Sequence, residues 1–130
     1  IGKSNIVVLP VSLMLMKRFA TVTVCHIHTK NLSSIVKKAD IIISACGQPQ
    51  MIRSDWLKPG VVIVDVGINH IPHPEKKGKM KLVGDCHFEE ASQIASYITP
   101  VPGGVGPMTV AMLMENTVKA TVRRAGTSCC

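Results

Sequence analysis

The chain has 130 residues, of which 46% are hydrophobic, and its mean hydropathy of +0.28 argues for one folded domain with its own core rather than for disorder. Its formal charge of +7 is scattered along the sequence, and four aromatic residues make no base-stacking surface, so we expect no nucleic-acid partner. The apolar runs fall short of the roughly 18 residues of a membrane span, so we expect no membrane insertion.

The first part of the chain alternates apolar runs with segments of helical character. Three runs predict strands, over residues 20–25, 39–46 and 60–66. The last two runs are almost continuously apolar, which is typical of strands buried on both faces of a parallel sheet. The connecting segments predict helices over residues 11–19 and 32–38 and a single turn over 54–57.

The pattern changes after Gly67. Prolines, a glycine and lysines between residues 70 and 81 predict a surface loop or hairpin, which is followed by a short strand over 81–83. The later elements, in chain order, are predicted to be a helix over 88–97, a strand over 96–99, a long amphipathic helix from Pro107 and a flexible tail over 125–130.

This order of elements predicts an α/β fold, namely a Rossmann-like, doubly wound and mainly parallel sheet with helices on both faces. The opening residues, Ile1 to Ser4, resemble a loop that leaves a strand. We therefore interpret the first, central strand as missing and the chain as part of a longer protein. The alternative is that residues 5–9 form that strand and that Pro10 ends it.

The opening loop is also the first candidate site. Gly2 would let the backbone approach a phosphate closely, and Lys3 and Ser4 would add a cation and a hydroxyl before a helix. A common NAD site has Asp or Glu at the end of the second strand, but this sequence has His26 after Cys25. We therefore predict NADP as cofactor, with NAD as the alternative, and we expect no metal at these histidines.

Further candidates follow the other predicted strands. Residues 46–48 and 67–69 should line a crevice at the carboxyl ends of the parallel strands. Asp65 lies at the same edge, and we interpret it as a partner of backbone amides rather than as a general base. The stretch from Pro100 to Pro107 contains three prolines and three glycines, a composition that favours one backbone path able to present backbone groups to a flat ligand. The alternative is a purely structural loop.

The five cysteines are odd in number and irregularly spaced, and none form a C-x-x-C motif. We expect reduced thiols in an intracellular protein, cytoplasmic in our prediction and mitochondrial as the alternative.

Four segments resemble a known family: YITPVPGGVGPMTVAML at 97–113, DVGIN at 65–69, LVGD at 82–85 and ADIIISACGQP at 39–49. Over roughly residues 1–124 the chain resembles the methylenetetrahydrofolate dehydrogenase/methenyltetrahydrofolate cyclohydrolase family. That family oxidises 5,10-methylenetetrahydrofolate with NADP or NAD and hydrolyses 5,10-methenyltetrahydrofolate to 10-formyltetrahydrofolate. Its members have two domains and are usually dimers.

The resemblance implies that residues 1–124 are the second, NAD(P)-binding domain of such an enzyme and that a folate is the substrate. The family's catalytic lysine and tyrosine lie in the first domain, so this chain alone is expected to be inactive and to need that N-terminal domain as a partner. The intact protein is expected to be a homodimer. The implied cofactor-binding residues are Gly2, Lys3, Ser4, His26, Cys46, Gly47, Ile68 and Thr109. The implied folate-facing wall consists of Pro102, Gly103, Gly104, Val105, Gly106 and Pro107.

Three positions depart from the family pattern, and all three concern the anionic end of the cofactor. Lys3 replaces an arginine, Val8 replaces a glycine, and Ile27 replaces a serine found in many members that use NADP. An alternative function is therefore a truncated, catalytically inactive module for nucleotide binding or dimerisation.

Overall fold

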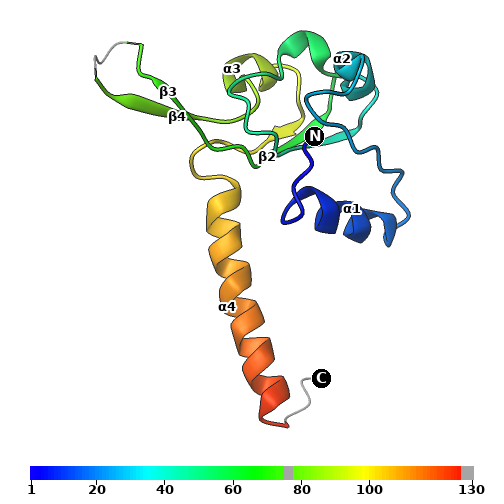
Figure 1. Ribbon diagram of the computed structural model, residues 1–130, viewed down its shortest axis with the longest axis vertical. Coiled ribbons are helices and arrows are strands. Elements are labelled where there is room, and N and C mark those ends of the chain that lie inside the picture. The colour runs from blue at the N-terminus through cyan, green and yellow to red at the C-terminus, as the bar shows by residue number, and fades with distance from the viewer. Residues whose placement is uncertain (75–77, 127–130) are drawn as a thin grey trace.

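The computed structural model describes residues 1–74 and 78–126, and its centre is a small parallel sheet. The sheet has three strands in the order β1 (Ile41–Ser44), β2 (Val62–Asp65) and β5 (Tyr97–Ile98). Figure 1 shows helix α1 (Val8–Met16) on one side of this sheet and α2 (Leu32–Val36) and α3 (Phe88–Ala91) on the other. The predicted α/β class and the mainly parallel sheet are therefore confirmed.

The core lies on one face of the sheet. Ile42 and Ile63 are adjacent in the register of β1 and β2, and both are almost fully buried. They pack with apolar residues from the helical layer and its loops, among them Val36, Ile52, Leu57, Val61 and Ala91. The opposite face is only half-covered, and Ile41 on it is 56% exposed. The predicted burial of both faces is thus only partial among the described residues.

The first two residues extend the sheet beyond β1. The amide of Ala45 donates to the carbonyl oxygen of Ile1 at 2.8 Å, and the amino group of Ile1 donates to the carbonyl oxygen of Ile43. On its other side, the amide of Gly2 donates to the carbonyl oxygen of Cys25 at 2.7 Å. Residues 1–2 therefore occupy the position between the end of β1 and the segment 20–25.

Two predictions about this region were wrong. Residues 20–25 form no strand, because a single backbone hydrogen bond to Gly2 joins them to the sheet and a strand requires a continuous ladder. The alternative strand over residues 5–9 is also absent: residues 5–7 form a turn and α1 begins at Val8, two residues before Pro10.

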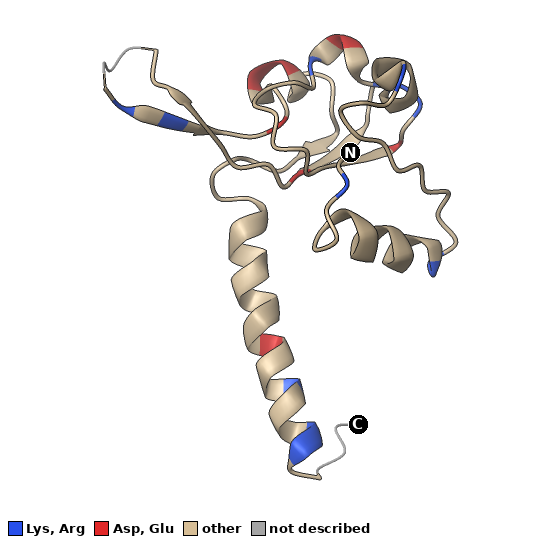
Figure 2. Ribbon diagram, in the orientation of Figure 1, with Lys and Arg blue, Asp and Glu red and all other residues tan. Residues whose placement is uncertain are grey.

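A two-stranded antiparallel hairpin leaves the sheet after β2. It consists of β3 (Asn69–Pro72) and β4 (Met80–Val83), and it projects from the body of the domain in Figure 1. The hairpin interpretation of residues 70–81 is confirmed for the described part of that range, with residues 75–77 outside it. Basic residues are spread over this hairpin, the far end of the last helix and the helical layer, as Figure 2 shows.

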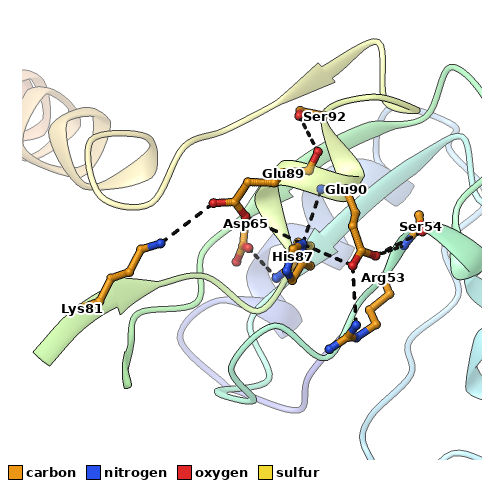
Figure 3. A network of polar contacts seen from close by, with 9 residues as sticks. Arg53, Ser54, Asp65, Lys81, His87, Glu89, Glu90 and Ser92 are labelled. Atoms are coloured by element: carbon orange, nitrogen blue, oxygen red, sulfur yellow. Dashed lines mark hydrogen bonds and ion pairs between the residues drawn. The ribbon is translucent and has the colours of Figure 1, made fainter. Parts of the chain in front are cut away.

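Helix α3 is shorter than predicted, and polar contacts tie it to the neighbouring loop. It ends at Ala91 because the chain must turn back to the sheet, where the amide of Ser96 donates to the carbonyl oxygen of Val61 at 2.9 Å. Figure 3 shows Glu90 reaching from α3 to Ser54, at the start of the 3-10 helix η1 (Ser54–Trp56), and to Arg53. The Ser54 amide that donates to this carboxylate lowers the pKa of Glu90 below its usual value.

Helix α4 (Val105–Arg124) extends away from the sheet for 20 residues, as predicted, but begins two residues before Pro107. It has no fully buried residue, and large apolar side chains such as Leu113 and Met114 are about two-thirds exposed, at 66% and 67%. Of the predicted flexible tail, residues 127–130 lie outside the described part of the chain. Within that part, every helix is too short or too polar to cross a bilayer.

The core position of Ile63 generates a stability prediction. Ile63→Ala should lower the free energy of unfolding by about 2–5 kcal/mol, because truncating a buried isoleucine loses transfer free energy and leaves a cavity. Ile41→Ala is the matched control on the neighbouring strand, and it should cost far less because Ile41 is 56% exposed. Urea denaturation followed by circular dichroism measures both. Equal losses in the two variants would contradict this placement of the core.

Candidate functional site

The carboxyl ends of β1, β2 and β5 meet at one edge, because the three strands run parallel. Three loops leave the sheet there, over residues 45–48, 66–68 and 99–104. The opening residues reach the same edge through the bonds of Ile1 to Ile43 and Ala45. The candidate site is built from these four segments.

A buried carboxylate, that of Asp85, holds two of the loops together. Its Oδ2 accepts hydrogen bonds from the amides of Cys46 and Gly47, at 2.8 and 3.3 Å, and from the hydroxyl of Ser44 at 3.0 Å. Its Oδ1 accepts from the amide of Gln48 at 3.1 Å and from the side-chain amide of Asn69 at 2.9 Å. The loop after β1 and the loop after β2 are therefore fixed to the same side chain.

Asp65 makes a second arrangement of this kind. Its carboxylate accepts from the amide of Gly67 at 3.0 Å and from those of Asp85 and Cys86 at 3.1 and 2.8 Å. Its own amide donates to the hydroxyl oxygen of Thr99 at 2.8 Å, which links β2 to the end of β5. The interpretation of Asp65 as a partner of backbone amides is confirmed.

The two carboxylates pack so closely against glycines that no larger residue fits. A Cβ atom on Gly84 would lie 2.1 Å from Oδ2 of Asp65, and one on Gly67 would lie 2.3 Å from the carboxyl carbon of Asp85. Each aspartate thus contacts the backbone of the segment that carries the other. The loop after β2 and the segment after β4 are therefore joined by hydrogen bonds from both aspartates.

The surroundings of the two aspartates shift their pKa values in opposite directions. Burial raises the pKa of Asp65 above its usual value, and the three amides that donate to it oppose this only in part. Burial acts the same way on Asp85, but its hydrogen bonds from Asn69, Cys46 and Ser44 outweigh it and lower the pKa of Asp85. Burial also raises the pKa values of the Cys46 and Cys86 thiols, which favours the protonated, unreactive form.

Gly2 lies at the point where the chain leaves the sheet edge and continues towards α1. It is buried, its φ is +134°, and a Cβ atom there would lie 2.5 Å from the carbonyl oxygen of Ala45. Lys3 is exposed, Ser4 is half-buried, and the hydroxyl oxygen of Ser4 accepts a hydrogen bond from the amide of Ile6 at 3.2 Å. Helix α1 begins at Val8, so the predicted loop leading into a helix is present.

The connections on either side of Gly2 run in opposite directions. The segment that ends at Cys25 lies on one side of residues 1–2 and β1 lies on the other. In open α/β sheets, ligands bind outside the carboxyl ends of the strands at such a topological switch point. Gly2, His26 and the loop at Cys46 and Gly47 all border this point.

The other predicted site residues lie further away. Ile68 follows Gly67 in the loop after β2 and is 69% exposed. Thr109 lies on α4, where its hydroxyl donates to the carbonyl oxygen of Val105 at 3.3 Å, and no described contact joins it to the loops at the sheet edge. Residues 102–107 lead from β5 into the first turn of α4, and most of them are exposed.

Three residues that build the site were not predicted from the sequence, namely Asp85, Ser44 and Thr99. The available signal for Asp85 was the pair Gly84–Asp85 directly after a predicted strand, which repeats in reverse order the aspartate and glycine of residues 65–67. Its partners in residues 44–48 lie 37 to 41 residues earlier in the chain and Asn69 lies 16 residues earlier, separations that no local pattern encodes.

An α/β domain with a glycine-lined switch point and amide-rich loops at the same edge belongs to the nucleotide-binding class of folds. The family described as tetrahydrofolate dehydrogenase/cyclohydrolase, NAD(P)-binding domain, matches residues 1–125, and the chain belongs to this family. The resemblance seen in the sequence is thereby confirmed.

Curated relatives agree with this assignment. The chain is 57% identical over 126 residues to the bifunctional protein FolD 2 of Arabidopsis thaliana and 56% identical over 127 residues to FolD 1 of Rhizobium etli. In both comparisons 97% of this chain is covered, and it spans 42% of the relative's length.

Solved structures are similar in shape as well as in sequence. The bifunctional FolD methylenetetrahydrofolate dehydrogenase/cyclohydrolase of Campylobacter jejuni has a TM-score of 0.87 and 55% identity, covering 95% of this chain and 42% of that one. The Trypanosoma brucei enzyme, solved with NADP and an inhibitor, has a TM-score of 0.84 and 46% identity, covering 94% of this chain and 43% of that one.

The role of Asp85 can be tested by replacing it with the isosteric amide. Asp85→Asn should lower the free energy of unfolding by about 1–3 kcal/mol at neutral pH, because an NH₂ group would then face donors that a carboxylate accepts. Since the folded-state pKa of Asp85 is lowered below its usual value, its stabilisation is complete above that usual value and disappears as the pH falls through the lower folded pKa. The difference between wild type and variant should therefore shrink in acid.

Denaturant titrations at neutral and acid pH measure this difference. Asp40→Asn is the matched control, because its side chain is 83% exposed and makes one surface ion pair with Lys58. If Asp85→Asn were as stable at neutral pH as Asp40→Asn, the hydrogen bonds of the Asp85 carboxylate would contribute little to the stability of the fold.

Proposed function

We propose that this chain binds NADP and serves as the cofactor-binding part of a longer bifunctional folate enzyme. That enzyme would oxidise 5,10-methylenetetrahydrofolate with NADP and hydrolyse 5,10-methenyltetrahydrofolate to 10-formyltetrahydrofolate. The observation that carries the proposal is Gly2, which is buried at the switch point without room for a Cβ atom and is followed by a lysine, a serine and a helix.

The charge around this loop suits a cofactor with an extra phosphate. Residues 1–39 contain six basic side chains and no acidic one: Lys3, Lys17, Arg18, Lys30, Lys37 and Lys38. The position after Cys25, where an acid would hold the ribose hydroxyl of NAD, is His26. This composition favours NADP over NAD, which is the alternative cofactor.

The residues described here would hold and orient the cofactor rather than exchange protons with a substrate. Bound NADP supplies a hydride acceptor. Gly2, Lys3 and Ser4 would hold its phosphates, and Asp85 would position the Cys46–Gly47 loop beside them. Ile68, exposed at the next strand end, would border the nicotinamide, and Thr109 would complete the cofactor site. Asp65 and Asp85 are unsuited to general-base work because backbone amides already use their oxygens.

The remaining surfaces fit a partner domain and a folate. Residues 102–107 form an exposed stretch after β5 that would wall the folate, and residues 1–124 would be the NAD(P)-binding domain. The exposed apolar side chains of α4 fit a surface covered by the N-terminal catalytic domain, which would supply the catalytic groups. We propose a homodimeric, cytoplasmic enzyme as the working form.

A second candidate, a catalytically inactive nucleotide-binding or dimerisation module, is favoured by one contact. The Cγ2 atom of Val8 lies 3.0 Å from the position that a Cβ atom of Gly2 would occupy, so this side chain fills space directly beside the opening loop. Ile27, which is 45% exposed, likewise offers no hydrogen-bond donor after His26.

Titration of the 130-residue chain with NADPH and NADH tests whether it binds the cofactor. We expect saturable binding of both or of NADPH alone, with NADPH bound more tightly because of the basic first segment. The enhancement of nicotinamide fluorescence reports binding, and circular dichroism shows that the chain is folded. A folded chain that binds neither nucleotide would contradict the proposed function and would leave only the dimerisation form of the second candidate.

The position of Ile27 supplies a mutational prediction. Ile27→Ser should tighten NADPH binding by about tenfold and leave NADH binding unchanged, because one restored charge-assisted hydrogen bond to the 2′-phosphate contributes about 1.5 kcal/mol at the lower end of its range. Ile41→Ser is the matched control, since Ile41 is similarly exposed but lies at the opposite end of the strands. The same titration measures both variants. An unchanged affinity of Ile27→Ser would show that residue 27 lies away from the 2′-phosphate.

A further inference from the structure

Strand β1 lies at an edge of the three-stranded sheet, with β2 as its strand neighbour on one side. In a parallel ladder, successive residues of a strand turn their backbone groups to opposite sides. The amides of Val62 and Val66 donate to the carbonyl oxygens of Asp40 and Ser44, so residues 40, 42 and 44 face β2. Residues 41, 43 and 45 therefore turn their backbone groups to the open edge.

The first two residues of the chain cover only one end of this edge. The amino group of Ile1 donates to the carbonyl oxygen of Ile43, and the amide of Ala45 donates to the carbonyl oxygen of Ile1 at 2.8 Å. These two bonds place Ile1 opposite Ser44 in a parallel register. Within the described part of the chain, no backbone group bonds to Ile41 from this side, and its side chain is more than half exposed.

Residues 20–25 lie on the other side of the same gap. The amide of Gly2 donates to the carbonyl oxygen of Cys25 at 2.7 Å. Cys25 is only 4% exposed, yet among the described residues its own amide has no hydrogen-bond partner. A buried amide without a partner is unfavourable and rare in folded proteins. The β-branched residues of this segment favour a strand, so what it lacks is a neighbour to pair with.

We propose that the gap between β1 and residues 20–25 binds a short, extended, apolar segment of another molecule as an added parallel strand. The gap is one strand wide where residues 1–2 lie, because these residues bond to both of its sides. The added segment continues the register of Ile1 and places three residues opposite Ile43, Ile42 and Ile41. Binding of this kind relies on main-chain hydrogen bonds to an exposed strand edge.

The register determines which groups pair. The central residue of the added segment, opposite Ile42, donates to the carbonyl oxygen of Ile41 and accepts from the amide of Ile43. The residue opposite Ile43 donates to the carbonyl oxygen of Thr23 and accepts from the amide of Cys25, which then has a partner. Side chains alternate between the core face beside Ile42 and the opposite face beside Ile41. Both faces offer apolar neighbours, so the segment that fits is apolar throughout.

The peptide acetyl-Lys-Val-Ile-Val-amide tests this, with its lysine opposite the exposed Asp40 to keep it soluble. It is titrated into the isotope-labelled 130-residue chain and followed by NMR. We expect saturable shifts and slowed hydrogen exchange at the amides of Cys25 and Ile43, with no change at Val83 on the hairpin. The same peptide with an N-methyl group on its central isoleucine should bind about fivefold more weakly or worse, because one main-chain donor is lost.

Two substitutions in the chain test the side formed by residues 20–25. Thr23→Pro removes an amide that faces the gap and should weaken binding of the peptide by about fivefold. Val22→Pro is the matched control in the same segment, because its amide points away from the gap, and it should bind like the wild type. Circular dichroism shows that both variants are folded.

A chain extended by Lys-Val-Ile-Val directly before Ile1 supplies the last comparison. Its added residues would fill the gap from within, so it should not bind the free peptide. Equal binding by the extended and the 130-residue chains would overturn the proposal, because the peptide would then lie elsewhere. Absence of shifts at Cys25 and Ile43, or equal losses in Thr23→Pro and Val22→Pro, would overturn it too. None of these outcomes depends on whether the domain binds NADP.

Discussion

The reciprocal hydrogen bonding of Asp65 and Asp85 is the constraint on which the rest of the structure depends. Each carboxylate accepts backbone amides from loops that are far apart in the sequence, and each packs against a glycine beside the other. Buried carboxylates are costly without such donors. Here these donors join the ends of β1, β2 and β5 at one edge of the sheet.

The buried acidic groups and the basic groups near Gly2 have different roles in this arrangement. The carboxylates of Asp65 and Asp85 accept hydrogen bonds from backbone amides, whereas the charged side chains of residues 1–39 are all basic. An anionic ligand at Gly2 would therefore meet only basic charged side chains from this segment.

Local patterns predicted most of the elements but not their full geometry. The apolar runs located β1 and β2, and the amide-binding role of Asp65 was predicted correctly because an aspartate followed by glycine at a strand end can bond its own loop. Asp85 was missed because its partners are distant in the chain. Residues 20–25 were wrongly predicted as a strand because β-branched composition reports propensity, and a strand also needs a neighbour along its whole length.

The sequence by itself determined the α/β class and the family, because these depend on local periodicity and on specific motifs such as PVPGGVGPMT. Only the tertiary structure decided which carboxylate holds which loop and how Val8 fills the space beside Gly2. These features depend on contacts between segments far apart in the chain or on close packing within the opening loop. Neither is encoded in the spacing of residues along the sequence.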